Sequence, residues 1–415
     1  MNKAPEEQYR ERQRRVTDAI ELNIPDRVPV MSLLGFFPAK YAGITCKEAM
    51  YDDEKMMKAW VETVSELQPD THENPFFYLS FGSVLGTLDF KQLKWPGQGV
   101  DIGHGYQFVE GEYMKSEDYD AFLFDPTDFM IRSYWPRIFE ALKPFEKLPH
   151  LREIISYYMG LGHFAAFGLP EVTKAIEALL KAAKAARKMV SGGIAYEQKM
   201  KELGFPIQFG STTQAPFDTL GDFFRGTRGA MLDLYRNPDK VLQAIEKFYP
   251  IMLRLGGSAK KRENKGVFIP IHKGLDSFMS EGHFKTFFWP SLRRLITDLI
   301  AEGLNPIVLW EGDCTSRLEI IADIPKGKAV YWLERTDIFK AKEILRDIVC
   351  IRGNVPLSIM CTGTSDDVRA YCKKLIDYVG KGGGFIMDCS TVLDDAKPEN
   401  VKAMFEFTKE FGRYD

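Results

Sequence analysis

The stretch NPIVLWEGDCTSRLEIIADIPKGKAVYWLE, residues 305–334, alternates a short apolar run, a helical pattern and a second apolar run. The apolar runs at 305–311 and 329–334 each end in a glutamate, and the segment between them has helical apolar spacing. Strands that are apolar on both faces and joined by helices are typical of parallel sheets covered by helices. This stretch therefore predicts an α/β fold built from βαβ units.

The same alternation extends over most of the chain. Strand-like runs occur at eight positions: 26–34, 70–82, 205–212, 266–272, 306–311, 329–334, 348–354 and 383–389. Eight parallel strands with helices between them indicate a (β/α)8 TIM barrel, a fold that accommodates a chain of this length as one unit. We expect residues 1–25 to form an N-terminal helical extension. Residues 26–415 would form the barrel, with an insertion at about 90–150.

The composition indicates a globular protein and argues against nucleic acid and a membrane as partners. Of the 415 residues 45% are hydrophobic, and the net charge of −3 comes from acidic and basic residues mixed along the chain. No basic face is evident, so nucleic acid is not an expected partner. No run approaches the ~18 apolar residues of a membrane span. The polar start MNKAPEEQYRERQRR does not resemble a secretion signal, so we expect a cytoplasmic protein, for which a homodimer is a compatible assembly.

Polar residues gather at the ends of the late strands, where TIM barrels carry their active sites. They are His272, Glu311 with Asp313 and Cys314, Glu334, Asn354, and Asp388 with Cys389, while Cys361 follows the strand at 348–354. An alternative explanation is that the Asp and Asn residues cap the following helices and that the cysteines are small buried residues. In a reducing cytosol the six cysteines are not expected to form disulfides.

Three motifs resemble the uroporphyrinogen decarboxylase superfamily. They are the opening RRVTDAIELNIPDRVPV, the middle APFDTLGDFFRGTRGAMLDLYRNPDKV, and GNVPLSIMCTGTSDDV followed by AKPENVKAM. The fold of this superfamily is a TIM barrel, in agreement with the strand count. The superfamily divides into porphyrinogen decarboxylases and methyltransferases that work with corrinoid proteins.

The charge near the first strand separates these two branches. Decarboxylases of the family need several arginines just after this strand, because their substrate carries eight carboxylates. Here the stretch reads VPVMSLLGFFPAKYAG, which contains no arginine and a single lysine, Lys40. An apolar, aromatic mouth cannot neutralise such a substrate, so the sequence favours the methyltransferase branch.

That resemblance implies a zinc site. Family methyltransferases typically bind zinc through a His-x-Cys motif at one strand end and a second cysteine at the end of the last strand. Aligned with this motif, VLWEGD places Leu309 at the histidine position and Glu311 at the first cysteine position. Cys389 in FIMDCS matches the second cysteine. Carboxylates and thiolates both bind Zn²⁺, at ~2.0–2.3 Å.

We assign Glu311, Cys361 and Cys389 as the zinc ligands, and His272 and Cys314 are the alternatives for the third position. Cys361 is chosen because its loop neighbours Cys389 in barrel order. The competing interpretation is a site without zinc, in which the thiols are buried and Glu311 binds the substrate directly.

A zinc with three protein ligands leaves one position open for a substrate. As a Lewis acid it would polarise an ether oxygen and stabilise the leaving phenolate or alkoxide. The resemblance supplies the nucleophile, the Co(I) of a corrinoid (cobalamin) carried by a partner protein. The implied activity is methyl transfer from an aryl methyl ether to the corrinoid protein, the first step of O-demethylation, with Glu311 and His272 as catalytic residues.

Aromatic residues near the expected mouth favour a flat apolar donor such as a methoxyphenol over methanol or a methylamine. Phe36, Phe37 and Phe217 are the candidate ring contacts. Arg225 could orient a ring hydroxyl or carboxylate, or serve as a structural ion-pair partner. Two other functions remain open: methyl transfer from a methylcorrinoid to a thiol or folate, and a metal-free barrel that binds an aromatic ligand.

Overall fold

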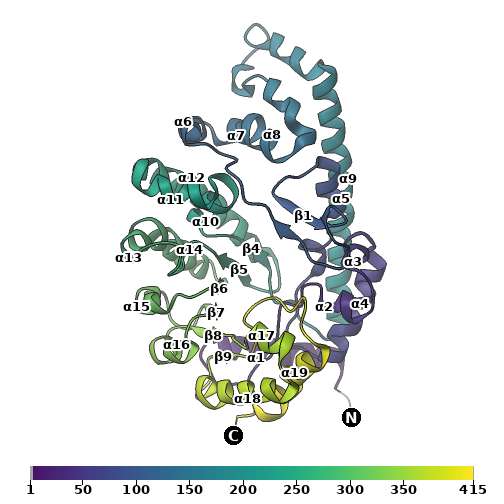
Figure 1. Ribbon diagram of the computed structural model, residues 1–415, viewed down its shortest axis with the longest axis vertical. Coiled ribbons are helices and arrows are strands. Elements are labelled where there is room, and N and C mark those ends of the chain that lie inside the picture. Colours follow the sequence, from purple (N-terminus) through teal and green to yellow (C-terminus); the bar gives the residue numbers. More distant parts are fainter. Residues whose placement is uncertain (1–2, 415) are drawn as a thin grey trace.

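The computed structural model describes residues 3–414, and a parallel six-stranded sheet lies at its centre (Figure 1). The strand order is β4-β5-β6-β7-β8-β9, so each strand pairs with its successor in the chain. These strands are β4 (Ser211–Thr212), β5 (Gly266–Ile271), β6 (Asn305–Trp310), β7 (Val330–Leu333), β8 (Cys350–Arg352) and β9 (Phe385–Ile386).

Two further extended segments close the sheet into a ring. Val30 pairs in parallel with Met387, which follows β9, and His72 pairs in parallel with Ile207, which precedes β4. The N–H of Asp70 donates to the carbonyl of Val30 at 2.9 Å and joins the two segments to each other. The ring therefore contains eight segments in sequence order, and the predicted (β/α)8 barrel is confirmed.

Helices cover the outside of the barrel (Figure 1). The longer ones that follow or precede the strands are α4 (Asp53–Leu67), α9 (Pro170–Glu202), α11 (Gly226–Arg236), α12 (Pro238–Gly257), α14 (Trp289–Ala301), α16 (Ile338–Leu345), α18 (Ser365–Leu375) and α19 (Pro398–Phe411). Short helices fill the connections: α2 (Phe37–Tyr41), α3 (Cys46–Tyr51), α10 (Pro216–Asp218), α13 (Glu281–His283), α15 (Leu318–Ile321) and α17 (Leu357–Thr362). No helix among residues 3–414 is both long and apolar enough to cross a membrane.

The N-terminal helix α1 (Pro5–Ile20) closes the amino end of the barrel. Ala19 and Ile20 of this helix form one apolar cluster with residues from five strand segments: Met31, Ile307, Val330, Cys350 and Ile386. All seven side chains are at least nine-tenths buried. This apolar packing covers the amino end of these strands, and TIM barrels bind their ligands at the opposite, carboxyl end.

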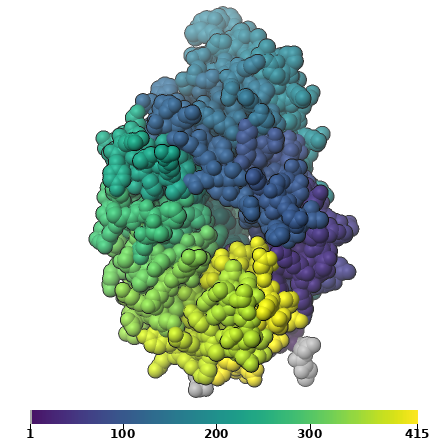
Figure 2. All heavy atoms as spheres, in the orientation of Figure 1, coloured from purple at the N-terminus to yellow at the C-terminus, as the bar shows by residue number. Residues whose placement is uncertain are grey.

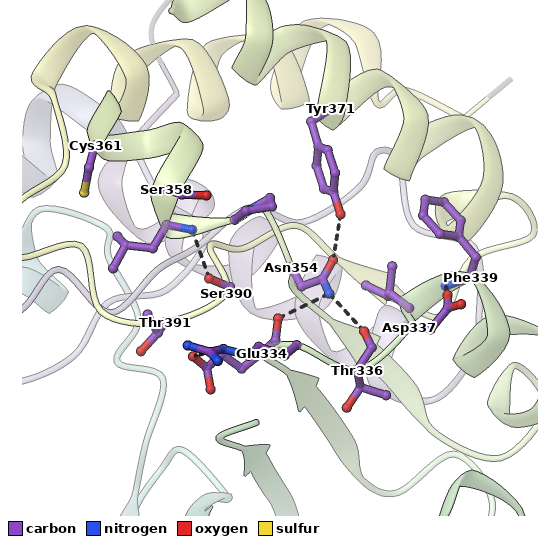
Figure 3. Close-up of a pocket in the computed structure, with 14 residues that line it drawn as sticks. Glu334, Thr336, Asp337, Phe339, Asn354, Ser358, Cys361, Tyr371, Ser390 and Thr391 are labelled. Carbon is purple, nitrogen blue, oxygen red and sulfur yellow. Dashed lines mark hydrogen bonds and ion pairs between the residues drawn. The ribbon is translucent and has the colours of Figure 1, made fainter. Parts of the chain in front are cut away.

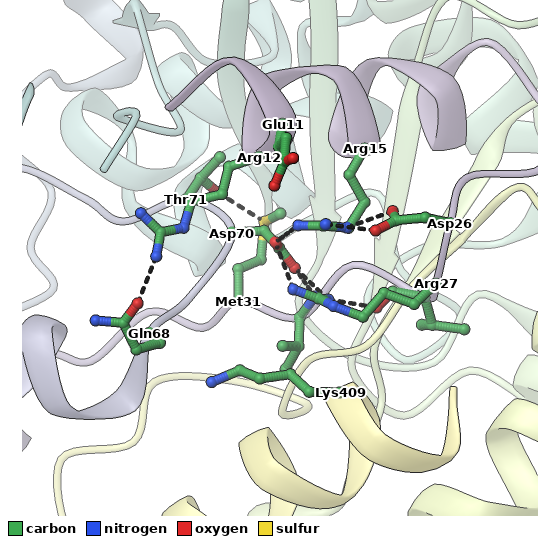
Figure 4. A network of polar contacts seen from close by, with 12 residues as sticks. Glu11, Arg12, Arg15, Asp26, Arg27, Met31, Gln68, Asp70, Thr71 and Lys409 are labelled. Carbon is green, nitrogen blue, oxygen red and sulfur yellow. Dashed lines mark hydrogen bonds and ion pairs between the residues drawn. The ribbon is translucent and has the colours of Figure 1, made fainter. Parts of the chain in front are cut away.

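A buried carboxylate fixes α1 to the barrel (Figure 4). Asp70 has no exposed surface and accepts hydrogen bonds from Arg15 of α1 at 2.6 Å and from Arg27 at 2.8 Å. Arg15 also pairs with Asp26 at 2.6 Å. Arg15, Asp26 and Arg27 all belong to the opening motif RRVTDAIELNIPDRVPV, so part of that motif serves to attach the helix to the barrel.

Residues 82–169 leave the barrel ring and, with α9, form the upper part of the molecule in Figure 1. This segment contains α5 (Gly82–Leu88), α6 (Tyr119–Phe124), α7 (Pro126–Phe129) and α8 (Trp135–Ile138), and the small sheet of β1 (Leu93–Pro96), β2 (Gly99–Val100) and β3 (Gln107–Phe108). It has an apolar cluster of its own with α9: Leu88, Leu142, Phe145, Leu148, Val172, Ala175 and Ala182. The part at about 90–150 that the sequence suggests as an insertion lies within it.

Candidate functional site

A cavity of about 950 Å³ opens at the carboxyl end of the barrel strands. Its lining is mainly aromatic and aliphatic: Leu33, Phe36, Phe77, Tyr78, Leu79, Tyr106, Phe209, Phe268, Leu309 and Val392. Figure 2 shows the molecule hollowed at its centre, between the blue residues after β1 and the yellow C-terminal residues. We call this the mouth cavity. Its size and lining suit a ligand with an aromatic ring.

Glu73 is a buried carboxylate on the wall of the mouth cavity. It accepts hydrogen bonds from the N–H of Leu34, from the hydroxyl of Tyr78 at 3.0 Å and from the amide of Gln208 at 3.4 Å. All three donors are neutral. Burial raises the pKa of Glu73 to about 7.

Asp394 is the second carboxylate of the cavity wall, and Gly35 makes room for it. The N–H of Phe36 donates to Asp394 at 2.6 Å. Gly35 has a φ of +56°, and a Cβ there would meet the Asp394 carboxylate, so a glycine is needed for both reasons. Burial raises the pKa of Asp394, while the nearest lysine, Lys40, is paired with Asp395 at 2.5 Å.

Strand register brings His272 and Glu311 together at the edge of the cavity. Ile271 of β5 pairs with Trp310 of β6, so the next residue of each strand, His272 and Glu311, lie side by side. The N–H of Glu311 donates to the carbonyl of Ile271 at 3.2 Å, and His272 Nε2 lies 3.4 Å from Glu311 Oε2. Gly312 follows with a φ of +148° and ends the strand.

Two aspartates of the motif APFDTLGDFF support His272 from behind. Asp218, in α10, accepts the N–H of His272 at 2.9 Å and that of Lys273 at 2.8 Å. Asp222, in the π-helical turn Thr219–Phe224, lies 2.6 Å from His272 Nδ1 and 3.3 Å from Lys273 Nζ. Gln214 donates to the same Asp222 carboxylate at 2.6 Å. The imidazole is therefore held between two carboxylates, Asp222 and Glu311.

This arrangement favours a protonated imidazole. Burial lowers the pKa of His272, but the hydrogen bonds to Asp222 and Glu311 and the carboxylate charges outweigh it and raise this pKa to about 11. Burial, followed by repulsion from Asp222, raises the pKa of Asp218 to about 7. At neutral pH His272 consequently holds a proton on Nε2, directed at Glu311.

The spacing of these two side chains also matches that of two ligands on one zinc ion. Two ligands of a tetrahedral zinc with bonds of ~2.0–2.1 Å stand about 3.3–3.5 Å apart, and His272 Nε2 and Glu311 Oε2 are separated by 3.4 Å. Asp222 on the other ring nitrogen is the carboxylate that zinc-binding histidines usually carry. Within residues 3–414, the set of three or more candidate ligands whose atoms lie within 4.8 Å of each other is Asp218, Asp222 and His272.

The cysteines of the expected zinc set lie elsewhere on this end of the barrel. Cys361 is on α17 and lines a second cavity, of about 770 Å³, with Glu334, Asn354 and Tyr371 (Figure 3). Cys389 is fully buried after β9. Neither belongs to a group of close candidate ligands in the described chain, so their role as zinc ligands stays a prediction.

Cys314 and Asp313, from the stretch that follows Glu311, have local partners. Cys314 is fully buried, and its thiol lies 3.2 Å from the hydroxyl of Thr336. Burial raises the pKa of this thiol to about 12. Asp313 accepts the N–H of Thr315 at 2.8 Å at the start of the next helical turn. Both residues thus stabilise the loop that carries Glu311.

The expected substrate contacts divide into two groups. Phe36 lines the mouth cavity, whereas Phe37 is buried against Tyr41 and Phe217 against Phe288. Arg225 is buried away from this cavity, with ion pairs to Asp233 and Glu112, both at 2.5 Å. These ion pairs agree with the second role suggested for Arg225, that of a structural ion-pair partner.

Sequence reasoning missed four residues of the site: Glu73, Tyr106, Asp218 and Asp222. A usable signal existed for the aspartates, which stand four residues apart in the family motif after the strand at 205–212. Glu73 lies within the strand-like run predicted at 70–82. Tyr106 lies in the segment outside the barrel, and no pattern in the sequence indicates that this segment returns to the mouth.

The family follows from a match that covers more than half of the chain. The family model described as "Uroporphyrinogen decarboxylase (URO-D)" matches residues 166–411. The chain belongs to the uroporphyrinogen decarboxylase family. The matched range includes Asp218, Asp222, His272 and Glu311, the polar cluster at the mouth.

Curated members of this family are distant relatives. Uroporphyrinogen decarboxylase from Chlorobium phaeobacteroides is 26% identical over 190 residues, which cover 43% of this chain and 51% of the relative. The enzyme from Chlorobaculum parvum is 26% identical over 186 residues, with the same coverage. The chain thus spans about half the length of the curated relatives it matches.

A solved structure resembles the chain over almost its whole length. It is a methyltransferase from Methanosarcina mazei, with a TM-score of 0.62 and 14% sequence identity, and the similarity covers 96% of this chain and 98% of the other. At this identity the similarity establishes a shared barrel fold.

Proposed function

We propose that this protein is a methyltransferase that moves a methyl group from an aryl methyl ether to a Co(I) corrinoid carried by a separate protein. The observation that carries the proposal is an aromatic cavity at the barrel mouth with the His272–Glu311 pair at its edge. The methyltransferase from Methanosarcina mazei with the same fold supports it.

The charge of the cavity argues against a porphyrinogen decarboxylase. Its lining contains four carboxylates, from Glu73, Glu197, Glu311 and Asp394, and one cation, Arg262. Arg262 is already paired with Glu197 at 3.0 Å. A substrate with eight carboxylates would meet mainly negative charge here, and its own charges would stay unpaired.

The residues around the cavity can carry out three tasks. The aromatic rings bind the arene of the donor and exclude water from the reacting methyl group. Glu311 and His272 would hold zinc, which supplies a Lewis acid for the ether oxygen when it is bound. Asp222 orients His272 through Nδ1, and Asp218 fixes the backbone at His272. The C–O bond breaks, and its electron pair remains on the phenolate oxygen.

The hollow face of the molecule is where the corrinoid partner would dock, because the nucleophile must reach the methyl group through the mouth (Figure 2). The corrinoid supplies that nucleophile, since no side chain of the cavity can displace a phenolate from a methyl carbon. This requirement is also why we propose a protein partner.

The test is a reaction of the purified protein with methoxyphenol and a corrinoid protein reduced to Co(I). Release of the free catechol or phenol, in proportion to the loss of Co(I) absorbance, is the expected result. Phe36→Ala should raise KM for the methoxyarene, because the ring lines the cavity, while Phe217→Ala, behind the wall, serves as a comparison for general loss of packing.

Two outcomes would replace this proposal. Methyl transfer from methylcorrinoid to a thiol or a folate, without cleavage of any methoxyarene, would assign the second half-reaction, in which the corrinoid passes its methyl group to an acceptor. A protein that binds methoxyphenol but contains no zinc and performs neither transfer would be a binding barrel instead of an enzyme.

A further inference from the structure

Two carboxylates of the mouth cavity, those of Glu73 and Asp394, form no ion pair with any residue between 3 and 414. Glu73 has three neutral hydrogen-bond partners and is 1% exposed. Asp394 is bound by the N–H of Phe36, while Lys40 is taken by Asp395. A buried carboxylate without a cation is costly, and it becomes favourable when a cation is brought to it.

Aromatic rings with open surface face the same cavity. Phe77 and Tyr106 each remain 44% exposed although both line it. Tyr106 also stands edge-on to Phe36, with ring centroids 6.4 Å apart. Burial raises the pKa of Tyr106 to about 12, and the negative charges of Asp394 and Glu311 add to this shift.

Rings and carboxylates around one cavity are the chemistry that recognises an organic ammonium ion. The ring faces attract a cation through their quadrupoles, and the carboxylates pair with it. The cavity is also much larger than a methoxyphenol requires, at about 950 Å³. There is room for an arene and for a side chain that ends in a charged group.

We propose that the methyl donor is a methoxyarene with a cationic amine side chain, and that Glu73 and Asp394 bind the ammonium group while the ether lies at His272 and Glu311. This inference rests on the proposed methyltransferase function, because the ether end is placed by that function. The position of the ammonium group is argued from the residues of the mouth cavity alone.

The test compares three ligands that differ in one terminal group. They are 4-methoxyphenethylamine, which is a cation at pH 7, the neutral 4-methoxyphenethyl alcohol, and the anion 4-methoxyphenylacetate. Binding to the full-length protein is measured by calorimetry without any corrinoid. The amine should bind about tenfold or more tightly than the alcohol, and the anion should bind most weakly.

Variants test which carboxylates are responsible. Glu73→Gln and Asp394→Asn should each reduce the preference for amine over alcohol and leave the affinity for the alcohol nearly unchanged. Asp366→Asn is the matched control, because Asp366 is an exposed carboxylate on α18 that pairs with Arg369. If one cavity variant does not fold, the other and the three ligands on the native protein still decide the question.

The outcomes separate this inference from the proposed function. Equal affinity for amine and alcohol overturns the inference, even if methoxyarenes are demethylated. A strong preference for the amine that each cavity variant reduces supports it. If the amine binds most tightly but no ether is cleaved with Co(I) corrinoid, the charge preference stands and the methyltransferase function falls.

Discussion

If His272 and Glu311 hold zinc as proposed, a zinc ion would compete with a proton for the place between them. The 3.4 Å separation of Nε2 and Oε2 accommodates a shared proton or two ligands of one metal ion. Since zinc binds the neutral imidazole, uptake of zinc would release the Nε2 proton into solvent. Zinc affinity should therefore rise with pH throughout the range below the His272 pKa of about 11.

Alanine variants test the ligand assignment. Glu311→Ala removes one of the two closest donors, so bound zinc and demethylation should fall together, by about tenfold or more. Cys389→Ala should have the same effect if the alignment with the family motif is right, and Cys314→Ala should leave both nearly intact. The measurement is zinc content by mass spectrometry beside turnover. Metal lost from Cys314→Ala and kept by Glu311→Ala would contradict the assignment.

Asp222 sets the protonation state of His272. In the native protein the imidazole signal should not titrate between pH 6 and 9 by NMR, because its pKa is about 11. Stability from this raised pKa is fully present below pH 6.5 and is lost as the pH rises through about 11. Asp222→Asn removes the nearer carboxylate and should bring the titration down toward that window. Asp101→Asn, beside the exposed His104, is the control and should leave His272 unchanged.

The raised pKa of Glu73 leads to a prediction about the stability of the protein that can be tested without a substrate. Its pKa of about 7 lies above the usual 4.5, so the folded protein holds a proton there and loses stability as the pH rises from about 4.5 to about 7. The full shift corresponds to about 3 kcal/mol. Glu73→Gln should therefore be more stable than the native protein by about 1–3 kcal/mol at pH 8 in urea unfolding. The gain should vanish near pH 4.5, and a gain independent of pH would point to packing instead of charge.

At the scale of elements, the barrel could be predicted from the sequence, but the contacts among the polar residues at its mouth could not. Apolar strands such as 305–310 predict a parallel sheet because both of their faces are buried. Asp222 could not be assigned to His272, because their contact depends on a π-helical turn that redirects the aspartate. Glu311 follows β6, whereas Cys361 lies on α17 after β8, two strands further round the barrel, and the two residues line different cavities.

One buried carboxylate, that of Asp70, attaches α1 to the barrel. Asp70→Asn would leave the guanidinium groups of Arg15 and Arg27 buried without their shared counter-ion. We expect a loss of about 3–5 kcal/mol in the free energy of unfolding, measured in urea. Asp366→Asn, which breaks the exposed pair with Arg369, should cost less than about 1 kcal/mol. Equal losses in the two variants would show that the network in Figure 4 does not hold the helix.

At the scale of the whole molecule, the barrel mouth and the upper end of the molecule have different surfaces. The mouth is hollow, and its lining contains four carboxylates and one cation. The segment at 151–169 instead exposes a run of large apolar side chains: Leu151, Ile155, Tyr157, Tyr158, Met159, Leu161, Phe164 and Leu169. Exposed apolar patches of this kind mark protein–protein contacts. A protein that covered this segment would leave the mouth cavity accessible, because the segment contributes no residue to that cavity.

The homodimer compatible with the sequence would use this apolar segment. Ile155 and Tyr157 are 70% and 83% exposed, so burial against a second copy would remove a large apolar area from water. The native protein should sediment as a dimer, and the double variant Ile155→Glu, Tyr157→Glu as a monomer. Tyr235→Glu, at an equally exposed tyrosine on α11, should stay dimeric. Demethylation should persist in the monomer, because the mouth cavity contains no residue of this segment. A native protein that sediments as a monomer would rule the homodimer out.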